Sequence, residues 1–164
     1  AGILEAPHSL LALAAADCAE FALNLLPLAD HERVLLPLID MCRQWVEGTV
    51  EAEECAQASR DVLAIYQEPG GETSDSPTAG YATAAVSAAV TVPTYTSALG
   101  ISCACAAAAL ASAQVATPND EDAIAAAHLR CSEIVRERVP FEALTSSDAF
   151  QRYALEAESG VLEE

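Results

Sequence analysis

Zinc-binding residue types occur in the second half of the sequence, at Cys103, Cys105, His128 and Cys131. Zinc accepts three thiolates and an imidazole, and His128 lies one helical turn before Cys131. Cys103 and Cys105, however, are two residues apart, so on a helix their side chains point about 200° away from each other. A tetrahedral site would require that helix to unwind. We therefore expect no metal site, and no other pattern in the sequence implies a cofactor.

The residue types that perform catalysis are present but lack a catalytic setting. A reactive cysteine needs a neighbouring base and a positive environment, and His8, His31 and His128 belong to no catalytic motif. The carboxylates cluster with one another rather than facing an apolar pocket that would prepare one of them for acid-base work. A glycine-rich phosphate loop is also missing from the sequence. We therefore expect a protein that is not an enzyme.

Asp17 and Glu20 lie one helical turn apart in an otherwise apolar segment. Carboxylates that are partly buried need cationic partners, and the arginines that could serve are Arg33, Arg43 and Arg60. This structural pairing is the interpretation that we favour. A role in binding is the alternative, so both carboxylates stay among the candidate binding residues.

The overall charge limits the classes of partner. The chain has 25 acidic residues against seven arginines, has no lysine, and carries a formal net charge of −18. Such a surface repels phosphate backbones and anionic lipids, so we expect no nucleic-acid or membrane partner. Basic proteins are the partners that it would attract, more strongly at low salt. High solubility or adaptation to high salt would also account for the acidity, and composition alone does not separate these causes.

The most acidic helical face is expected on a helix over residues 49–67, opened by Thr49. Its outward residues are Glu51, Glu53, Glu54, Gln57 and Asp61. A buried stripe at helical spacing is predicted for Val50, Cys55, Ala58, Val62, Ile65 and Tyr66. The four carboxylates of this face form the leading candidate binding surface.

A second acidic site is expected at the start of a helix over residues 117–138. Thr117 is the predicted N-cap and Pro118 the first helical residue, so that Asp120, Glu121 and Asp122 lie at the positive end of the helix dipole. The predicted inner face consists of Ala123, Ile124, Ala127, Cys131, Ile134 and Val135. The three carboxylates form the second candidate binding surface.

Composition and periodicity predict an all-α fold. Of the 164 residues 52% are hydrophobic, many of them alanine, the strongest helix former. We expect a single domain of about six or seven helices, with residues 79–115, within the uncharged stretch 76–119, as its alanine-rich central helical pair. A Pro/Gly/Ser loop over 68–78 joins the halves 1–67 and 79–158. The predicted helices cover 10–26 after Ser9 as N-cap, 30–47 with Pro37 inside, 49–67, 79–92, 94–115, 117–138 and a short segment after Ser146 or Ser147.

The cysteines and the chain start indicate a cytoplasmic protein. The six cysteines stand in helical, apolar surroundings without a disulfide framework, which is typical of reduced packing residues. The first apolar run has no basic region before it, so we interpret it as a helix rather than a signal peptide. Pro93 and Gly100 interrupt the uncharged stretch, which argues against a membrane span there.

Several segments together resemble a known family. Residues 17–20 read DCAE, residues 25–28 read LLPL, and residues 42–50 read CRQWVEGTV. This pattern, with the later alanine-rich segment and RERVP at 136–140, is similar to the alanine-rich helical immunity protein family of bacterial polymorphic-toxin systems. The resemblance implies a helical protein that neutralises a toxin. Histidines, which members of that family commonly carry in the central helices, do not occur between His31 and His128.

We therefore expect a non-catalytic immunity or inhibitor protein that binds a cognate, basic bacterial toxin through its acidic surface. One alternative is a structural or self-associating helical module, and a homo-oligomer stays open. A further alternative is a bundle that binds a small ligand near Trp45, Tyr81 and Tyr95.

Overall fold

The computed structural model of the chain describes residues 2–25, 29–67, 77–94, 108–111, 113–114 and 116–140. The regular structure within these residues is helical, which confirms the all-α bundle. Its elements are α1 (Gly2–Asn24), α2 (Ala29–Val46), α3 (Ala52–Gln67), α4 (Pro77–Thr91), the 3₁₀ turn η1 (Val92–Thr94) and α6 (Glu121–Arg138). None of the described helices combines the length and the apolar composition needed to cross a bilayer.

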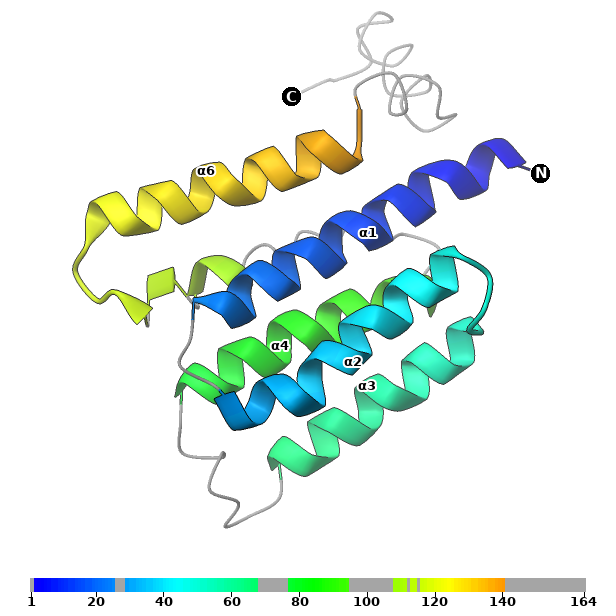
Figure 1. Cartoon of the computed structure of the whole chain (residues 1–164), viewed down its shortest axis with the longest axis horizontal. Helices are drawn as coiled ribbons and strands as arrows, with labels where there is room; N and C mark the ends of the chain where they lie inside the picture. Colours follow the sequence, from blue (N-terminus) through cyan, green and yellow to red (C-terminus); the bar gives the residue numbers. More distant parts are fainter. Residues whose placement is uncertain are drawn as a thin grey trace, which may run out of the picture.

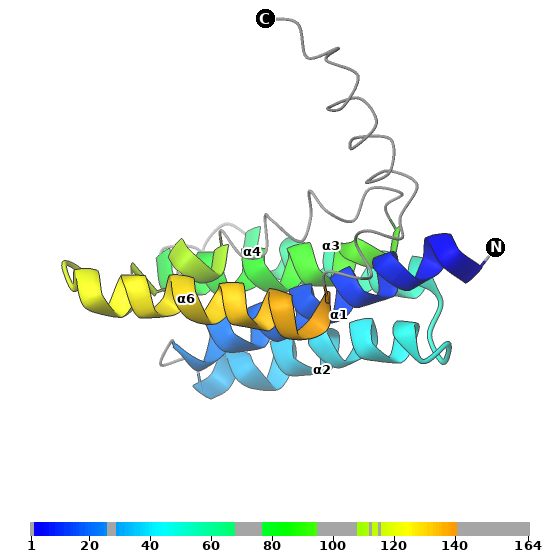
Figure 2. The same cartoon turned by 90° about the horizontal axis from the view of Figure 1, so that it is seen from above.

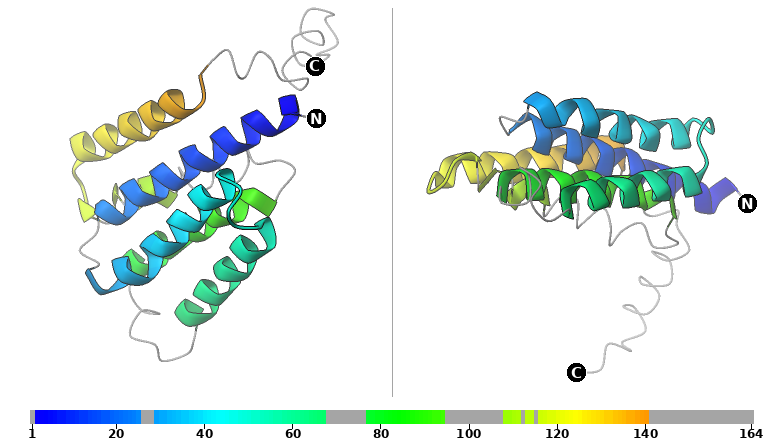
Figure 3. Two further views of the ribbon diagram at one scale, coloured as in Figure 1. Left: turned by 45° about the vertical axis from the view of Figure 1, so that its right-hand side comes forward. Right: turned by 90° about the horizontal axis from the view of Figure 1, so that it is seen from below.

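Helices α1 and α4 occupy the centre of the bundle (Figure 1). Helix α1 packs against α2, α4 and α6, whereas α4 packs against α1, α2 and α3. Helices α3 and α6 lie at opposite edges of the molecule. Views at right angles place α2 and α4 on different sides of α1 (Figures 2 and 3). The acidic helix α3 thus lies at an edge, packed against α4 and α2.

Small side chains line the central contacts. The residues of α1 and α4 that belong to the core cluster and are 0–1% exposed are Ala12, Ala15, Ala16, Cys18, Ala19, Ala22, Leu23, Ala85, Val86, Ala89 and Val90. Alanine lets helix backbones approach closely, and the larger Leu35 and Ile39 of α2 fill the space beside them. The predicted burial of the alanine-rich stretch is confirmed for α4. Helix α1 shares the centre, and residues 95–107 of the predicted central pair lie outside the described residues.

Cys42 marks the point where α1, α2 and α4 meet. Its thiol lies 3.6 Å from the carbonyl oxygens of both Ala12 and Ala89, to which it donates. The thiol of Cys55 donates in the same way to the carbonyl of Met41, at 3.7 Å. These fully buried cysteines fill the space of a small apolar residue and also reach the backbone of neighbouring helices.

Hydroxyl groups join α3 to α4. The hydroxyl oxygen of Ser59 lies 2.8 Å from that of Ser87 and 3.3 Å from that of Thr91. Both serines are buried, so these bonds satisfy groups that would otherwise be costly to remove from water. The predicted buried stripe of α3 is confirmed at Cys55 and Val62. Val50 and Ala58, which also belong to that prediction, are only half-buried, whereas Ser59 and Ala56, which do not, are buried. The side chains of Ile65 and Tyr66 lie outside the described ones.

The turn from α2 to α3 begins with a Schellman motif. Gly48 has φ 76° and donates to the carbonyl of Trp45, while Thr49 donates to that of Gln44. The prediction that Gly48 ends the second helix is therefore confirmed. Thr49 does not open the third helix, because its hydroxyl also binds Gln44.

Helix α3 instead begins after Glu51. The backbone N–H of Glu51 donates to the carboxylate of Glu54 at 2.9 Å, and the N–H of Glu54 donates to the carbonyl of Glu51. The first of these bonds is one of the two bonds of a capping box, the one in which the side chain at the third helical position accepts from the backbone N–H of the N-cap residue. Glu54 is therefore held in place by the helix end that it stabilises.

Two other predicted helix starts were wrong. Helix α1 begins at Gly2, so Ser9 lies inside it; Pro7 does not stop the helix, since only one hydrogen bond near its start is lost. Helix α2, by contrast, begins at Ala29, one residue before the predicted start, and contains Pro37 as predicted. Helix α4 begins at Pro77, a residue well suited to a first helical position, so residues 77 and 78 do not belong to the loop.

The remaining predicted segments fall outside the described residues. They are the rest of the loop, 68–76, and the short last helix after Ser146 or Ser147. The helix break at Pro93 is described, since α4 passes into the 3₁₀ turn η1 at Val92.

Replacing Gly48 and Gly80 by alanine should change the free energy of unfolding in opposite directions, although both glycines have open space around them. A Cβ at Gly48 or at Gly80 meets nothing within 4 Å, but only Gly48 has a positive φ. We expect Gly48→Ala to lower the free energy of unfolding by about 1–2 kcal/mol through left-handed strain. Gly80→Ala, within α4, should raise it by about 0.5–1 kcal/mol. Urea unfolding of both variants measures the difference, and equal effects would contradict the assigned turn.

Stability should fall at high pH because of Cys42. Burial, followed by the nearby Cys55, raises the pKa of the Cys42 thiol from 9.0 to about 12. The folded chain keeps this proton to a higher pH than the unfolded chain, so the contribution is complete below pH 9.0 and is lost as the pH rises to about 12. The loss approaches about 1.4 kcal/mol per pH unit.

Urea unfolding across this pH range checks the slope. Cys42→Ala should flatten it, whereas Ile39→Val, which removes one buried methyl group and costs about 0.5–1.5 kcal/mol, should leave it unchanged. An unchanged slope in Cys42→Ala would rule out the thiol as its cause.

Candidate functional site

The acidic face of α3 is exposed as predicted. Glu51, Glu53, Glu54 and Asp61 are all exposed, with Gln57 and Arg60 between them. Among the described residues that form ion pairs, Glu53 has the most solvent-accessible side chain, at 82%. Because Cys55, Ala56, Ser59 and Val62 fix the opposite side of the helix, the carboxylates point away from the bundle. We call Glu51, Glu53, Glu54 and Asp61 the α3 acidic face.

Side-chain bonds along the α3 acidic face hold several of its carboxylates. Gln57 donates to Asp61 at 2.6 Å, and Arg60 donates to Glu53 at 2.8 Å and also to Gln57. Glu54 is held by the N–H of Glu51. Exposed pairs of this kind contribute little stability, about 0–1 kcal/mol. Their effect is to limit the rotamers of an acidic surface whose single interspersed arginine, Arg60, offsets only part of its charge.

The second acidic site begins three residues later than predicted. Asp120, rather than Thr117, caps α6, because its carboxylate accepts the N–H of Ala123 at 2.9 Å. The hydroxyl of Thr117 donates back to the carbonyl of Ala113, and Asn119 reverses the chain with φ 67°. Glu121 and Asp122 remain exposed in the first turn, where the helix dipole favours negative charge. This site is the end of a helix, and each acidic residue there has a structural reason.

The inner face of α6 follows the prediction with one exception. Ala127, Cys131 and Ile134 are buried, and Ala123 and Ile124 are half-buried. Val135 is 38% exposed, so its predicted burial was wrong. Among the described helices α6 packs chiefly on α1, so only one side of α6 is covered by another described helix.

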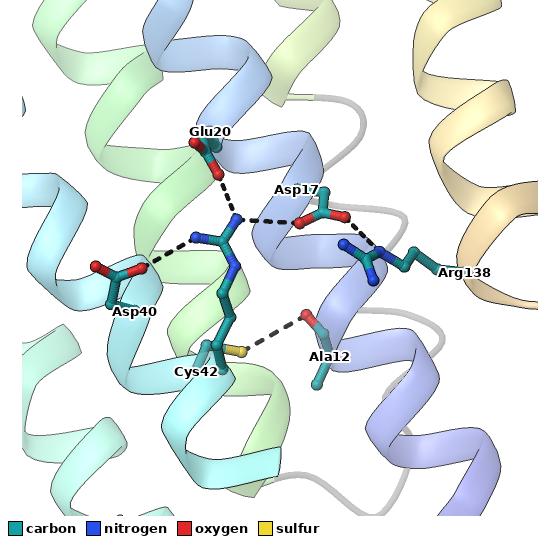
Figure 4. Close-up of polar contacts among 7 residues, drawn as sticks. Ala12, Asp17, Glu20, Asp40, Cys42 and Arg138 are labelled. Carbon is teal, nitrogen blue, oxygen red and sulfur yellow. Dashed lines mark hydrogen bonds and ion pairs between the residues drawn. The ribbon is translucent and has the colours of Figure 1, made fainter. Parts of the chain in front are cut away.

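Asp17 and Glu20 are paired with arginines rather than presented to a partner. Arg43 of α2 donates to Asp17 and to Asp40, each at 3.0 Å, and also to Glu20 (Figure 4). Arg138, at the end of α6, donates to the other oxygen of Asp17 at 2.5 Å. This cluster joins α1, α2 and α6. The expected structural pairing with Arg43 is confirmed, whereas Arg60 pairs with Glu53 and the side chain of Arg33 lies outside the described ones.

The charge on Arg43 is fixed by these contacts. Partial burial alone would lower its pKa, but hydrogen bonds to Glu20 and Asp17 outweigh that effect and raise the pKa of Arg43 above its usual range. Asp17 is the least exposed carboxylate of the cluster, with 18% of its side chain accessible. The cluster is therefore an ionic link between helices, and both oxygens of Asp17 are engaged in it.

The four residues of zinc-binding type, for which no metal site was expected, are not brought together among the described residues. His128 is exposed on α6, whereas Cys131 faces α1 and is buried. Cys103 and Cys105 lie outside the described residues. Within the residues that are described, no group of three or more His, Cys, Asp or Glu side chains is arranged to hold a metal ion.

Trp45, a candidate for ligand binding, contacts another residue instead. Its ring lies 5.1 Å from that of His8, tilted by 51°. His8 in turn reaches the carbonyl oxygen of Val92 through its Nε2 at 2.7 Å, which ties the start of α1 to η1. The side chains of Tyr81 and Tyr95 lie outside the described ones.

The candidate residues thus occupy three separate places: the edge helix α3, the start of α6, and the interior side of α1. Sequence reasoning missed Arg138 and Asp40 as members of the α1 cluster. Asp40 had a local signal, since it lies one turn before Arg43, but Arg138 is 121 residues from Asp17 and had none. Comparison with protein-family models, with curated proteins and with solved structures finds no match.

Removing Arg43 should cost much more stability than removing Arg60. Arg43→Ala leaves three carboxylates without their shared partner, and we expect a loss of about 1.5–3 kcal/mol in the free energy of unfolding. Arg43→Lys keeps the charge but loses the planar guanidinium group, so its loss of stability should be smaller than that of Arg43→Ala. Arg60→Ala, at an exposed pair, is the matched control, with a loss of at most about 1 kcal/mol. Equal losses for the two alanine variants in urea unfolding would show that the cluster is not a structural link.

Proposed function

We propose that this chain is a non-catalytic immunity or inhibitor protein of the bacterial cytoplasm, which binds a cognate basic toxin through the α3 acidic face. The observation that carries this proposal is the exposure of four carboxylates on one side of an edge helix. The sequence resemblance to toxin-neutralising helical proteins supports it. Inhibition then needs no chemistry from this chain, because covering the active site of the toxin is sufficient.

Electrostatics favours such a partner. A net charge of −18 attracts a basic protein over long distances, and steering of this kind raises association rates by about 10–1,000-fold at low salt. The α3 acidic face adds a local pattern to that general attraction. Its carboxylates are held by Gln57, Arg60 and the backbone of Glu51, so less side-chain freedom is lost on binding.

The start of α6 is the weaker of the two acidic surfaces for this role. Asp120 is used as the N-cap, and Glu121 and Asp122 face the positive end of their own helix. We place Asp17 and Glu20 outside the proposed interface, because Arg43 and Arg138 already neutralise them. The proposed contact surface is therefore narrower than the set of candidates drawn from sequence.

Self-association is the second candidate function. Helix α6 exposes Leu129 and Val135, at 58% and 38%, on the edge opposite α3. The two side chains point about 120° apart around the helix, so Leu129, the more exposed, is the apolar residue that suits contact with a second copy, although it is small for a stable interface. Mass measurement in solution distinguishes the candidates: a dimer lost on Leu129→Gln supports self-association, and a monomer opposes it.

Neutralising the α3 acidic face should weaken binding to the toxin. The partner for the test is the product of a toxin-like gene adjacent to the gene of this chain. We expect Glu53→Gln with Glu54→Gln to lower the association rate about tenfold at low salt, with a smaller effect at high salt. Glutamine at position 54 keeps the capping interaction, so the fold is preserved.

The matched control removes the same charge elsewhere. Glu133 and Glu137 pair with Arg130 on α6, as Glu53 pairs with Arg60 on α3. Glu133→Gln with Glu137→Gln should therefore change the association rate by less than about threefold. If both double variants lose the same amount, the α3 acidic face is not the interface. If no neighbouring gene product binds the unmodified chain, the proposed function is wrong.

A further inference from the structure

The outward side of α6 carries an apolar residue midway between two opposite charges. Asp122, Leu129 and Arg136 follow one another at intervals of seven residues. Seven residues are close to two helical turns, so successive members of this set point within about 20° of each other. All three are exposed, and Leu129 is the most exposed large hydrophobic residue among those described, at 58%. We call Asp122, Leu129 and Arg136 the α6 outer stripe.

The α6 outer stripe faces away from the bundle. Ala127 and Cys131, which are buried, lie two residues before and after Leu129, so their side chains point about 160° away from it. Helix α6 itself forms the edge of the molecule opposite α3 (Figure 1). The stripe is therefore open to a partner that approaches this edge.

The two charged residues of the stripe are not paired within the described part of the chain. The other arginines whose side chains are described all form ion pairs, whereas Arg136 forms none with a described residue. Asp122 likewise forms no ion pair with a described residue, in contrast to Asp120, whose carboxylate caps the helix. Both charges are thus available to a partner.

The stripe is complementary to a second copy of itself. Residues seven positions before and after Leu129 lie about 10.5 Å from it along the helix axis. When two copies of α6 lie antiparallel with their Leu129 side chains in contact, each Asp122 comes beside the partner's Arg136. This is the isologous contact of a two-fold dimer, in which residue i of one copy meets residue j of the other and the reverse. A parallel arrangement would place like charges together.

Small neighbouring side chains allow the two helices to approach. Ala125 and Ala126 precede Leu129 by four and three residues, so they lie beside it on the adjoining turn, and both are exposed. Small side chains at a helix contact permit a distance between axes near the lower end of the usual range of about 8–10 Å. The Leu129 contact and both ion pairs can then form at the same time.

We propose that the α6 outer stripe is an interaction surface for a second copy of this chain. The contact is antiparallel and two-fold symmetric, and it is held by the two Leu129 side chains and two pairs of Asp122 with Arg136. This inference rests on the self-association named above as the second candidate function, and it does not depend on toxin binding. Because α3 lies at the opposite edge, two copies joined through α6 leave both α3 acidic faces open (Figure 1).

The contact is expected to be weak. A helix of 18 residues is about 27 Å long and about 10 Å wide, so one of its faces is well below the roughly 800 Å² per partner of a standard interface. Two copies with a charge of −18 each also repel one another. An ionic strength of about 0.15 M screens that repulsion beyond about 8 Å. Association is therefore measured under this condition, at protein concentrations up to about 1 mM.

Charge reversal at the two ends of the stripe tests the arrangement. Sedimentation equilibrium gives the dimer dissociation constant of the full chain and of each variant. Arg136→Glu places like charges at both ends of the contact, and so does Asp122→Arg, so each variant alone should dimerise at least about tenfold more weakly. An equimolar mixture of the two variants restores both pairs of opposite charges. The mixture should form a heterodimer about as strongly as the unmodified chain dimerises.

Matched controls make the same charge changes at the opposite edge of the molecule. Arg60→Glu and Asp61→Arg alter exposed residues of α3 and change the net charge by the same amounts. Each should change the dimer dissociation constant by less than about threefold. Circular dichroism of all four variants shows whether the helices are retained.

Three results would overturn the proposal. They are an unmodified chain that stays monomeric at the highest concentration, single variants of the stripe that dimerise as strongly as the unmodified chain, and a mixture that stays monomeric. The first also removes self-association as a function, whereas the other two leave self-association through a different surface. Toxin binding through the α3 acidic face is measured separately and can stand or fail in each case.

A disulfide across the two-fold axis gives a second measurement, which keeps both charged residues. Position 129 meets itself in the proposed contact, so Leu129→Cys should form a disulfide between two copies in the presence of oxidised glutathione. Val135→Cys, at an exposed position that points about 120° away, should do so at least about tenfold more slowly. The unmodified chain gives the background from its six cysteines. Equal rates for the two variants would contradict the proposed contact.

Discussion

The close approach of α1, α2 and α4 is the constraint on which the rest of the structure depends. Alanines of α1 and α4 that are essentially inaccessible line this contact, and Cys42 of α2 reaches the backbone of both partners. A contact of this kind leaves no room for larger side chains, whose insertion typically costs about 1–3 kcal/mol. Because the centre is occupied by small residues, the edge helices α3 and α6 are placed with little freedom.

The charges follow the same division between centre and edge. Arg43 and Arg138 bind carboxylates between helices, where a lone acidic group would be costly. Arg60 and Arg130 pair with carboxylates on their own helices and stay exposed. Among the residues whose side chains are described, the arginines are therefore largely committed to pairs, and most of the carboxylates are left facing outward. The acidic character of the surface is a consequence of how the arginines are used, as well as of how many carboxylates there are.

Much of the architecture could be predicted from local patterns, because helical periodicity and Gly48 act over a few residues. The pairing of Asp17 and Glu20 with Arg43 also followed from the sequence, since charges in an apolar helix need a partner. Helix starts were less predictable: several residues near each start can cap, and the choice depends on how the preceding chain arrives, as at Asp120. The contact of Asp17 with Arg138 depends on which helices become neighbours, which no local pattern encodes.

The position of α3 at an edge has a further consequence for how such a protein can change over generations. The residues that bind α3 to the bundle, Cys55, Ser59 and Val62, are all on its inner side. Within the described part of the chain, the side-chain bonds of its outer residues run to one another. Substitutions on the outer side therefore leave the packing intact. A lineage could vary the chemistry of that surface freely while the scaffold beneath it is held nearly fixed by the size limit at its centre. One fold could in this way serve many partners, with recognition and stability inherited almost independently.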